Sequence, residues 1–173
     1  MEIRPATLSD VGPLRDLAER SFRAAFADQN DPADMDAYVL ETFTSERVRA
    51  EIDDPDNRFL LAVDGGALLG YAKLRDGDAD PSVTGPAPIE IERIYAAPES
   101  IGRGVGRALM QACLDTAAAM DRETIWLGVW ERNDRAIAFY ERWGFETVGA
   151  HGFQLGSDPQ TDLVMARAVG QII

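Results

Sequence analysis

Residues 94–109 of the chain read I-Y-A-A-P-E-S-I-G-R-G-V-G-R-A-L. The apolar segment Ile89–Ala97 is typical of a strand, and it leads into a glycine-rich turn from which a helical pattern begins. Glycine lacks a Cβ and adopts unusual backbone angles, so consecutive amide N–H groups can converge on one anion. A helix N-terminus adds partial positive charge, and Arg103 and Arg107 add full charges. This chemistry suits a pyrophosphate.

The glycine spacing narrows the choice of phosphate ligand. The turn has the pattern G-x-G-x-G at Gly102, Gly104 and Gly106, whereas the dinucleotide fingerprint is G-x-G-x-x-G. A P-loop needs Gly-Lys followed by Ser or Thr, which the turn lacks. The spacing therefore disfavours NAD and nucleoside triphosphates. The alternative is a glycine-rich turn that merely joins a strand to a helix.

The residues after the turn predict alternating helices and strands. Apolar residues recur at helical spacing over Arg103–Met120. A strand is expected at Thr124–Val129, and a helix at Asn133–Trp143 ends at Gly144, the residue type expected there. The closing strands are expected at Glu146–Phe153 and Leu163–Ala168.

The residues before the turn predict a strand at Glu2–Pro5 and a helix cap at Thr7–Asp10. Two strands joined by Asp64-Gly65-Gly66 form a hairpin signal. The two strands are expected at Arg58–Val63 and Ala67–Arg75. Two short acidic helices are expected at Asp34–Phe43 and Glu46–Asp53, and a mobile loop at Asp76–Pro88. The whole order predicts a single α+β domain over residues 1–173, with a central, mainly antiparallel sheet flanked by helices.

Composition restricts the function. The chain has 173 residues, 46% of them apolar, and a net charge of −13, which repels nucleic acid and attracts cations. No apolar segment reaches the ~20 residues of a membrane span, and the first residues do not resemble a signal peptide. The single Cys113 is expected to be a core residue, and one thiol predicts a cytoplasmic protein. The single His151 is expected to be structural, and no metal site is expected.

Two motifs together resemble the signatures of the GNAT superfamily of N-acetyltransferases. Gly104 and Gly106 match the acyl-CoA signature Gln/Arg-x-x-Gly-x-Gly/Ala, although Ile101 stands where Gln or Arg is usual. The second signature, L-x-V…N-x-x-A…F-Y…G-F, is matched by Leu127, Val129, Asn133, Ala136, Phe139, Tyr140, Gly144 and Phe145. The resemblance implies the GNAT fold, acetyl-CoA as co-substrate and acetyl transfer to an amine.

Further segments resemble the PaiA-type polyamine acetyltransferases of this superfamily. The likeness runs over nearly the whole chain and implies a small cationic amine, spermidine or spermine, as acceptor; it also makes a homodimer plausible. The segments are Phe26–Asn30, Tyr38, Glu90–Tyr95, Ile125–Glu131, Ala136–Tyr140, Gly149–His151 and Gln160–Leu163.

The resemblance also implies site residues. Tyr140 is expected to be the general acid for the leaving thiolate, and Glu92 the base that takes a proton from the amine. Glu90 is the rival base, since alternation places it on the same strand face as Glu92. The cofactor is expected to contact Ile94, Tyr95, Ala96, Ile101, Gly102, Arg103, Gly104, Val105, Gly106, Arg107, Asn133, Arg135, Tyr140 and Arg142.

Simpler roles exist for each of these residues. Tyr140 can be a packing aromatic, Glu92 a paired strand carboxylate, and Asn133 a helix N-cap. For the acceptor, Asp28, Asp31 and Glu90 are the expected carboxylates. The acidic run Asp28, Asp31, Asp34 and Asp36 is also typical of a solvated helix start. Two other functions stay open: a protein or peptide N-acetyltransferase, and a non-catalytic acyl-CoA-binding regulatory module. The presence of both Glu92 and Tyr140 disfavours the regulatory module.

Overall fold

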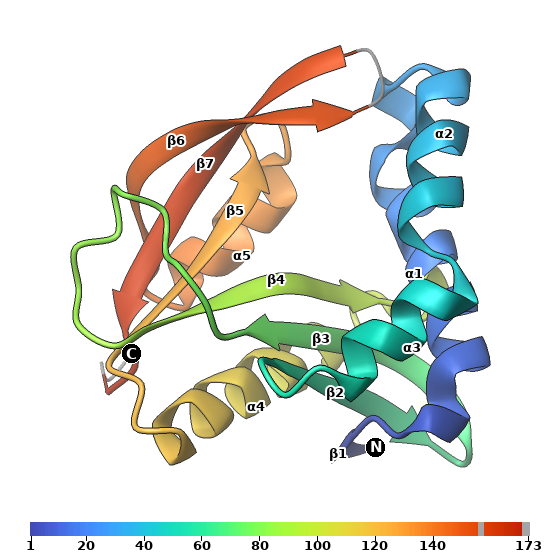
Figure 1. The fold of residues 1–173 in the computed structure, drawn as a ribbon, viewed down its shortest axis with the longest axis horizontal. Helices are drawn as coiled ribbons and strands as arrows, with labels where there is room; N and C mark the ends of the chain where they lie inside the picture. Colours follow the sequence, from blue (N-terminus) through green and yellow to red (C-terminus); the bar gives the residue numbers. More distant parts are fainter. Residues whose placement is uncertain (156–157, 171–173) are drawn as a thin grey trace.

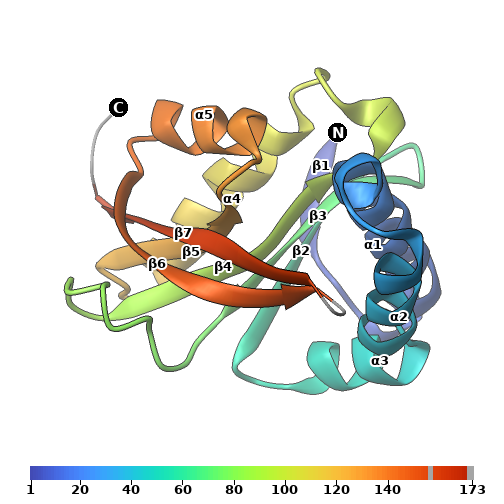
Figure 2. The same ribbon diagram turned by 90° about the horizontal axis from the view of Figure 1, so that it is seen from above.

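The computed structural model describes residues 1–155 and 158–170 and contains a seven-stranded sheet with helices on both faces (Figures 1 and 2). β4 and β5 pair in parallel, and all other neighbouring strands pair antiparallel. The predicted α+β class and mainly antiparallel sheet are therefore confirmed. In spatial order the strands are β1 (Glu2–Pro5), β2 (Asn57–Asp64), β3 (Ala67–Arg75), β4 (Pro88–Ala96), β5 (Thr124–Trp130), β7 (Asp158–Ala168) and β6 (Glu146–Leu155).

Helices cover the two faces of the sheet separately (Figure 2). One face carries α1 (Val11–Phe26), α2 (Pro32–Thr42) and α3 (Ser45–Asp53), and the other carries α4 (Val105–Ala119) and α5 (Asp134–Arg142). Each face has its own apolar core. Cys113 is fully buried in the α4–α5 core, as predicted, and burial raises the pKa of its thiol to about 12. Within the described residues, no helix has the length and apolar composition needed to cross a bilayer.

Local signals in the sequence determine several element boundaries. The Thr7 N–H donates a hydrogen bond to the Asp10 carboxylate at 2.8 Å, which confirms the predicted cap ahead of α1. The β2–β3 hairpin turns at Gly65 and Gly66, whose φ angles of +55° and +84° suit the predicted tight turn. At the end of α5, Gly144 has a φ of +78°, the left-handed conformation expected of a C-terminal glycine.

Several predicted boundaries differ from the structure by one or more residues, and three of these differences concern the site and the strand next to it. The helix expected from Arg103 begins at Val105, because Gly104 has a φ of +82° and ends the turn in a left-handed conformation. The helix expected from Asn133 begins at Asp134, because Asn133 is its N-cap. The strand expected from Leu163 begins at Asp158, since its polar first half pairs with β6 through the backbone, without an apolar alternation that would mark it.

The loop between β3 and β4, residues 76–87, lies against β6 (green in Figure 1). A Cβ on Gly149 of β6 would lie 2.4 Å from the Ser82 side chain, so the missing side chain allows this close approach. The Asp80 carboxylate contacts the His151 ring of β6 at 3.0 Å. The loop therefore brings an acidic side chain to the outer strands of the sheet.

The sheet opens between its two central strands. β4 and β5 pair only over Pro88–Glu90 and Thr124–Trp126, and beyond this point they diverge (Figure 1). The register between β3 and β4 shifts at the same place, because Lys73 pairs with Arg93 and Leu74 with Ile91, which leaves Glu92 as an extra residue. Such a bulge bends its strand and increases the local twist. The bulge at Glu92 thus turns β4 away from β5.

Candidate active site

The separation of the strands leaves backbone groups of β4 without a neighbouring strand. The Ala97 N–H donates to the carbonyl of Leu69 in β3 at 2.8 Å. Because N–H groups alternate in direction along a strand, those of Ile94 and Ala96 point toward the side that β5 has left. The Tyr95 amide, by the same alternation, faces β3. Of the three β4 amides predicted to contact the cofactor, Ile94 and Ala96 are therefore the available ones.

The glycine-rich turn presents a second group of unpaired amides. The first N–H groups of an α-helix have no acceptor within the helix, and the N-cap of α4 is Gly104, which has no side chain to accept from them. Gly102 has a φ of +81° and Gly104 one of +82°, and a Cβ at either position would point into open space. The turn Gly102–Arg107 is therefore an exposed anion-binding cradle, and its glycines have no side chains that would block a ligand.

Charged side chains surround this cradle. Arg103 and Arg107 are exposed and form no ion pair within the part of the chain that the structure describes. Ile101, which departs from the expected motif, is 44% exposed on the turn, whereas Val105 is buried. The predicted phosphate contacts therefore lie together at the N-terminus of α4, next to the point where β4 ends.

Asn133 lies beside a small cleft at the start of α5. Its side chain accepts a hydrogen bond from the Ala136 N–H at 3.2 Å, so the predicted N-cap role is confirmed. A cleft of about 220 Å³ is lined by Ala25, Gln29, Trp130, Arg132, Asn133, Asp134 and Arg135. Arg135 is thus near Asn133, whereas Arg142 is exposed at the far end of α5.

Tyr140 occupies the inner face of α5. Its ring is only 8% exposed and packs against Phe139 and Phe145, with ring centroids 5.5 and 5.9 Å away. Burial raises the pKa of the Tyr140 phenol well above its usual range, and the nearby Cys113 adds to this effect. The hydroxyl therefore stays protonated at neutral pH and can donate a hydrogen bond. Within the described residues it donates none.

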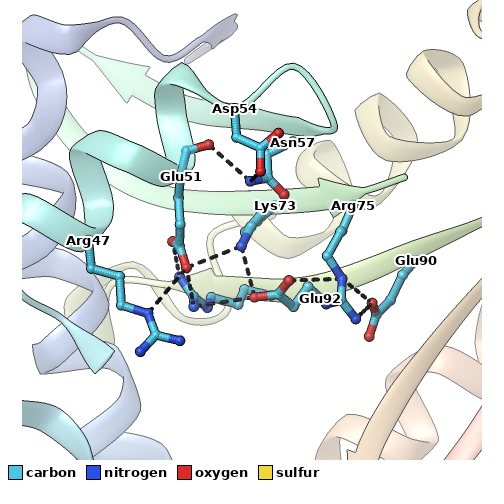
Figure 3. A network of polar contacts seen from close by, with 9 residues as sticks. Arg47, Glu51, Asp54, Asn57, Lys73, Arg75, Glu90 and Glu92 are labelled. Carbon is cyan, nitrogen blue, oxygen red and sulfur yellow. Dashed lines mark hydrogen bonds and ion pairs between the residues drawn. The ribbon is translucent and has the colours of Figure 1, made fainter. Parts of the chain in front are cut away.

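Glu92 is surrounded by cations (Figure 3). Its Oε1 lies 2.9 Å from Lys73 and 3.3 Å from Arg93, and its Oε2 lies 3.2 Å from Arg75. Glu90 contacts Arg75 at 2.6 Å, so both glutamates lie on the same face, as alternation predicts. Accepting a proton would cost Glu92 three ion pairs. Of the two roles predicted for Glu92, the structure therefore shows the simpler one, a paired strand carboxylate.

The ion pairs continue into α3. Glu51 pairs with Arg93 at 2.8 Å and with Lys73 at 3.2 Å, and the Arg93 guanidinium lies 5.5 Å from the Phe43 ring centroid. Burial pushes the pKa of Glu51 up, but the hydrogen bonds and charges of Arg93 and Lys73 outweigh it and lower the pKa. This network borders a polar cleft of about 390 Å³ between α3 and β2–β3. The network therefore fastens the bulged part of β4 to α3.

Glu90 differs from Glu92 in its surroundings. Burial raises the pKa of the Glu90 carboxyl, and the hydrogen bond and charge of Arg75 offset this effect only in part. The Glu90 carboxyl is therefore easier to protonate than an ordinary glutamate. Glu90 stands beside Trp126 in the last paired step of β4 and β5.

The acidic residues predicted for the acceptor are not gathered into one site. Asp31 caps α2 by accepting the Ala33 N–H at 2.8 Å, whereas Asp28 is exposed on the turn before α2. A carboxylate that the sequence interpretation missed is Asp162 of β7. Burial raises its pKa, an effect that the charge of His151 opposes. Its only signal in the sequence was its place in Gln160–Leu163, one of the segments that resemble the PaiA-type acetyltransferases. The strand was expected to begin after it, at Leu163.

Comparison with known proteins identifies the family. Residues 14–145 match the model of the acetyltransferase (GNAT) family. The chain is 32% identical over 153 residues to an uncharacterized N-acetyltransferase of Lactobacillus delbrueckii subsp. lactis, with 88% of each protein covered. It is 36% identical over 126 residues to the N-alpha-acetyltransferase RimI of Mycobacterium tuberculosis, covering 71% of this chain and 75% of that protein. The chain therefore belongs to the GNAT family and is an acetyltransferase.

A solved structure confirms the fold. PaiA N-acetyltransferase from Thermoplasma acidophilum, in complex with coenzyme A, matches with a TM-score of 0.79 over 96% of this chain and 98% of that one. The sequence identity is 20%, so the likeness establishes the shared fold and not the acceptor. Within the described residues, no group of three or more His, Cys, Asp or Glu side chains could hold a metal ion.

Replacing Gly104 with leucine should weaken acetyl-CoA binding at least about tenfold, because losing one hydrogen bond to a charged group costs ~1.5–3 kcal/mol. Gly66→Leu is a matched control. Gly66 also has a left-handed φ, +84°, and open space around a new Cβ, but it lies in the β2–β3 turn. Calorimetric titration of both variants measures the difference. Equal affinities in the two variants would remove the assignment of this turn to the pyrophosphate.

Proposed function

We propose that the chain transfers the acetyl group of acetyl-CoA to a primary amine of a small cationic acceptor, a polyamine such as spermidine or spermine. Acetyl transfer to an amine is the reaction of its family. The observation that carries the cofactor is the exposed cradle at Gly102–Arg107, which suits a pyrophosphate in shape and charge. The related fold of a protein in complex with coenzyme A supports the same co-substrate.

The proposed path of the cofactor follows the open backbone. The pyrophosphate binds at the α4 N-terminus, and the pantetheine arm runs between β4 and β5, where the Ile94 and Ala96 amides are available. One of these amides then stabilises the oxygen of the thioester carbonyl as it gains negative charge. Asn133 lines the cleft beside Trp130, the last residue of β5.

Tyr140 is proposed to stabilise the departing thiolate. Its hydroxyl is protonated at neutral pH because burial raises its pKa. A thiol has an ordinary pKa of about 8.5, so complete proton transfer from a buried phenol to the thiolate is uphill. The Tyr140 hydroxyl is therefore best suited to donate a hydrogen bond that strengthens as charge builds on sulfur.

Charge supports a cationic acceptor. The chain carries a net charge of −13, and a field of this sign raises the local concentration of polyamines. Asp162 adds a carboxylate to which no described side chain donates a hydrogen bond, and Asp28 is exposed on the turn before α2. Of the two β4 carboxylates that are candidates for the base, Glu92 holds three ion pairs, which favours Glu90 over Glu92.

A second candidate is acetylation of a protein or peptide N-terminus. It is favoured by the 36% identity with the N-alpha-acetyltransferase RimI. A non-catalytic acyl-CoA-binding module is a weaker alternative, because it would not need a buried tyrosine whose hydroxyl has no partner among the described residues.

Thiol release from acetyl-CoA with a panel of amines tests the acceptor. Spermidine should give a higher kcat/KM than amino acids and peptides, because its charges match the acidic protein. Added salt should reduce this preference, since the Debye length falls from about 10 Å at 0.1 M to about 3 Å at 1 M salt. Peptides that are better acceptors at every salt concentration would overturn the polyamine assignment.

The variant Tyr140→Phe keeps the ring and its packing and removes only the hydroxyl. It should lower kcat by about 10²–10³-fold, the cost of removing one hydrogen-bond donor to a developing charge, and change the KM for acetyl-CoA much less. Tyr71→Phe is the control, because the Tyr71 side chain is buried and its hydroxyl, like that of Tyr140, has no hydrogen-bond partner among the described residues. If both variants turn over at the wild-type rate, Tyr140 is a packing residue.

A further inference from the structure

An acidic side chain and the single histidine meet on the outer strands of the sheet. The Asp80 Oδ2 lies 3.0 Å from the Nδ1 of His151. Asp80 is itself held by Ser82, whose hydroxyl and amide donate at 2.6 and 2.9 Å. These hydrogen bonds lower the pKa of Asp80, and His151 adds to the effect. Asp80 is therefore an ionised and oriented partner for the His151 ring.

A carboxylate beside Nδ1 selects one neutral form of the ring. It favours a proton on Nδ1, because that proton is hydrogen-bonded to the carboxylate. The Nε2 atom then carries a lone pair and can accept a proton. Asp80 therefore orients the His151 ring in the same way as the aspartate of a catalytic triad orients its histidine.

The Nε2 atom of His151 faces the open part of β5. It lies 3.5 Å from the position that a Cβ on Gly128 would occupy, and the Oδ2 of Asp162 lies at the same distance from that position. Gly128 is exposed, so this space is reachable from solvent. The charged or titratable groups that act on His151 are Asp80 from the loop and Asp162 from β7.

Gly128 lies on the α1–α3 face at the opening of the sheet. Its neighbours Leu127 and Val129 belong to the opposite, α4–α5 core, and Trp130 contacts Phe26 of α1 with ring centroids 6.0 Å apart. The parallel pairing of β4 and β5 ends at Trp126, two residues before Gly128. A thioester held in the opening would therefore come next to Gly128.

We propose that His151, oriented by Asp80, is the base that takes the proton from the acceptor ammonium, and that Asp162 positions this ammonium over Gly128. This proposal rests on the proposed acetyl transfer and identifies the base of that reaction. It replaces the structural role expected for His151 and the carboxylate bases expected on β4. Glu92 and Glu90 then hold β4 in its bent shape through Arg75 and the neighbouring cations.

The proton balance is complete. The ammonium gives one proton to Nε2 of His151, and the free lone pair of nitrogen attacks the thioester carbonyl carbon. The C–S bond breaks with its electron pair on sulfur, which the Tyr140 hydroxyl stabilises. The second proton of the nitrogen neutralises the thiolate as the amide forms. The proton on His151 passes to water from the exposed side of the ring.

The ring can be observed directly because the chain has one histidine. Nitrogen-15 NMR of the neutral imidazole should show the proton on Nδ1 and a bare Nε2. Asp80→Asn should move the proton toward Nε2, whereas Asp78→Asn should not, since Asp78 is exposed in the same loop and has no partner among the described residues. A wild-type ring protonated on Nε2 would contradict the proposal, because that atom could not then accept a proton.

Kinetics with two acceptors separate a base from a structural residue. Propylamine and 2,2-difluoropropylamine have similar shapes, but fluorine makes the second amine much less basic and largely neutral at the assay pH. His151→Gln should lower kcat/KM for propylamine by about 10²–10⁴-fold, and lower it for the difluoro amine by less than about tenfold. A merely structural role would lower both equally.

Glu90→Gln and Glu92→Gln serve as the competing variants. If either shows the selective loss with propylamine while His151→Gln does not, the base is on β4 and the proposal is wrong. Equal losses of His151→Gln with both amines overturn it too. A wild type that releases no thiol with any amine contradicts the proposed function itself, and the NMR result still decides whether Asp80 and His151 form the oriented pair.

Discussion

The active site depends on the point at which β4 leaves β5. Parallel pairing covers three residues of each strand, and the bulge at Glu92 then bends β4 away. The bend frees backbone amides toward the opening and leads the chain into the turn at Gly102–Arg107. Without this separation, β4 amides would pair with β5. In the proposed reaction, the cofactor, the carbonyl and the amine meet where the sheet is incomplete.

Charged side chains hold this bent shape. Lys73 has a side chain only 4% exposed and lies between Glu51 and Glu92, while Arg93 joins the same two glutamates. Burying a charge is costly unless it is paired and hydrogen-bonded, and Lys73 and Arg93 each have two carboxylate partners here. Pairing fixes the extra residue of β4 against α3 and β3. A glutamate bound in this way stabilises the bent strand.

The sequence predicted most of the fold because its signals were local. The glycines of the β2–β3 turn, the cap at Thr7–Asp10 and the stop at Gly144 each act within a few residues. The glycine turn at Gly102–Arg107 is also a local signal, whereas Tyr140 was singled out through the resemblance to the GNAT signature. The Glu92 ion pairs required the β3–β4 register, and the pair of Asp80 and His151 joins residues 71 positions apart. Contacts between residues far apart in the sequence cannot be predicted from a short segment, so His151 was expected to be structural and Asp80 to belong to a mobile loop.

A crystal structure with bound acetyl-CoA tests the central claim most directly. The account predicts that the pyrophosphate contacts the amides at the N-terminus of α4 and that the pantetheine arm lies between β4 and β5. The thioester should come within reach of Gly128, with the Tyr140 hydroxyl on the sulfur side. A cofactor bound elsewhere, for example in the polar cleft beside Lys73 and Glu51, would contradict the account, because the opening of the sheet would then have no part in acetyl transfer.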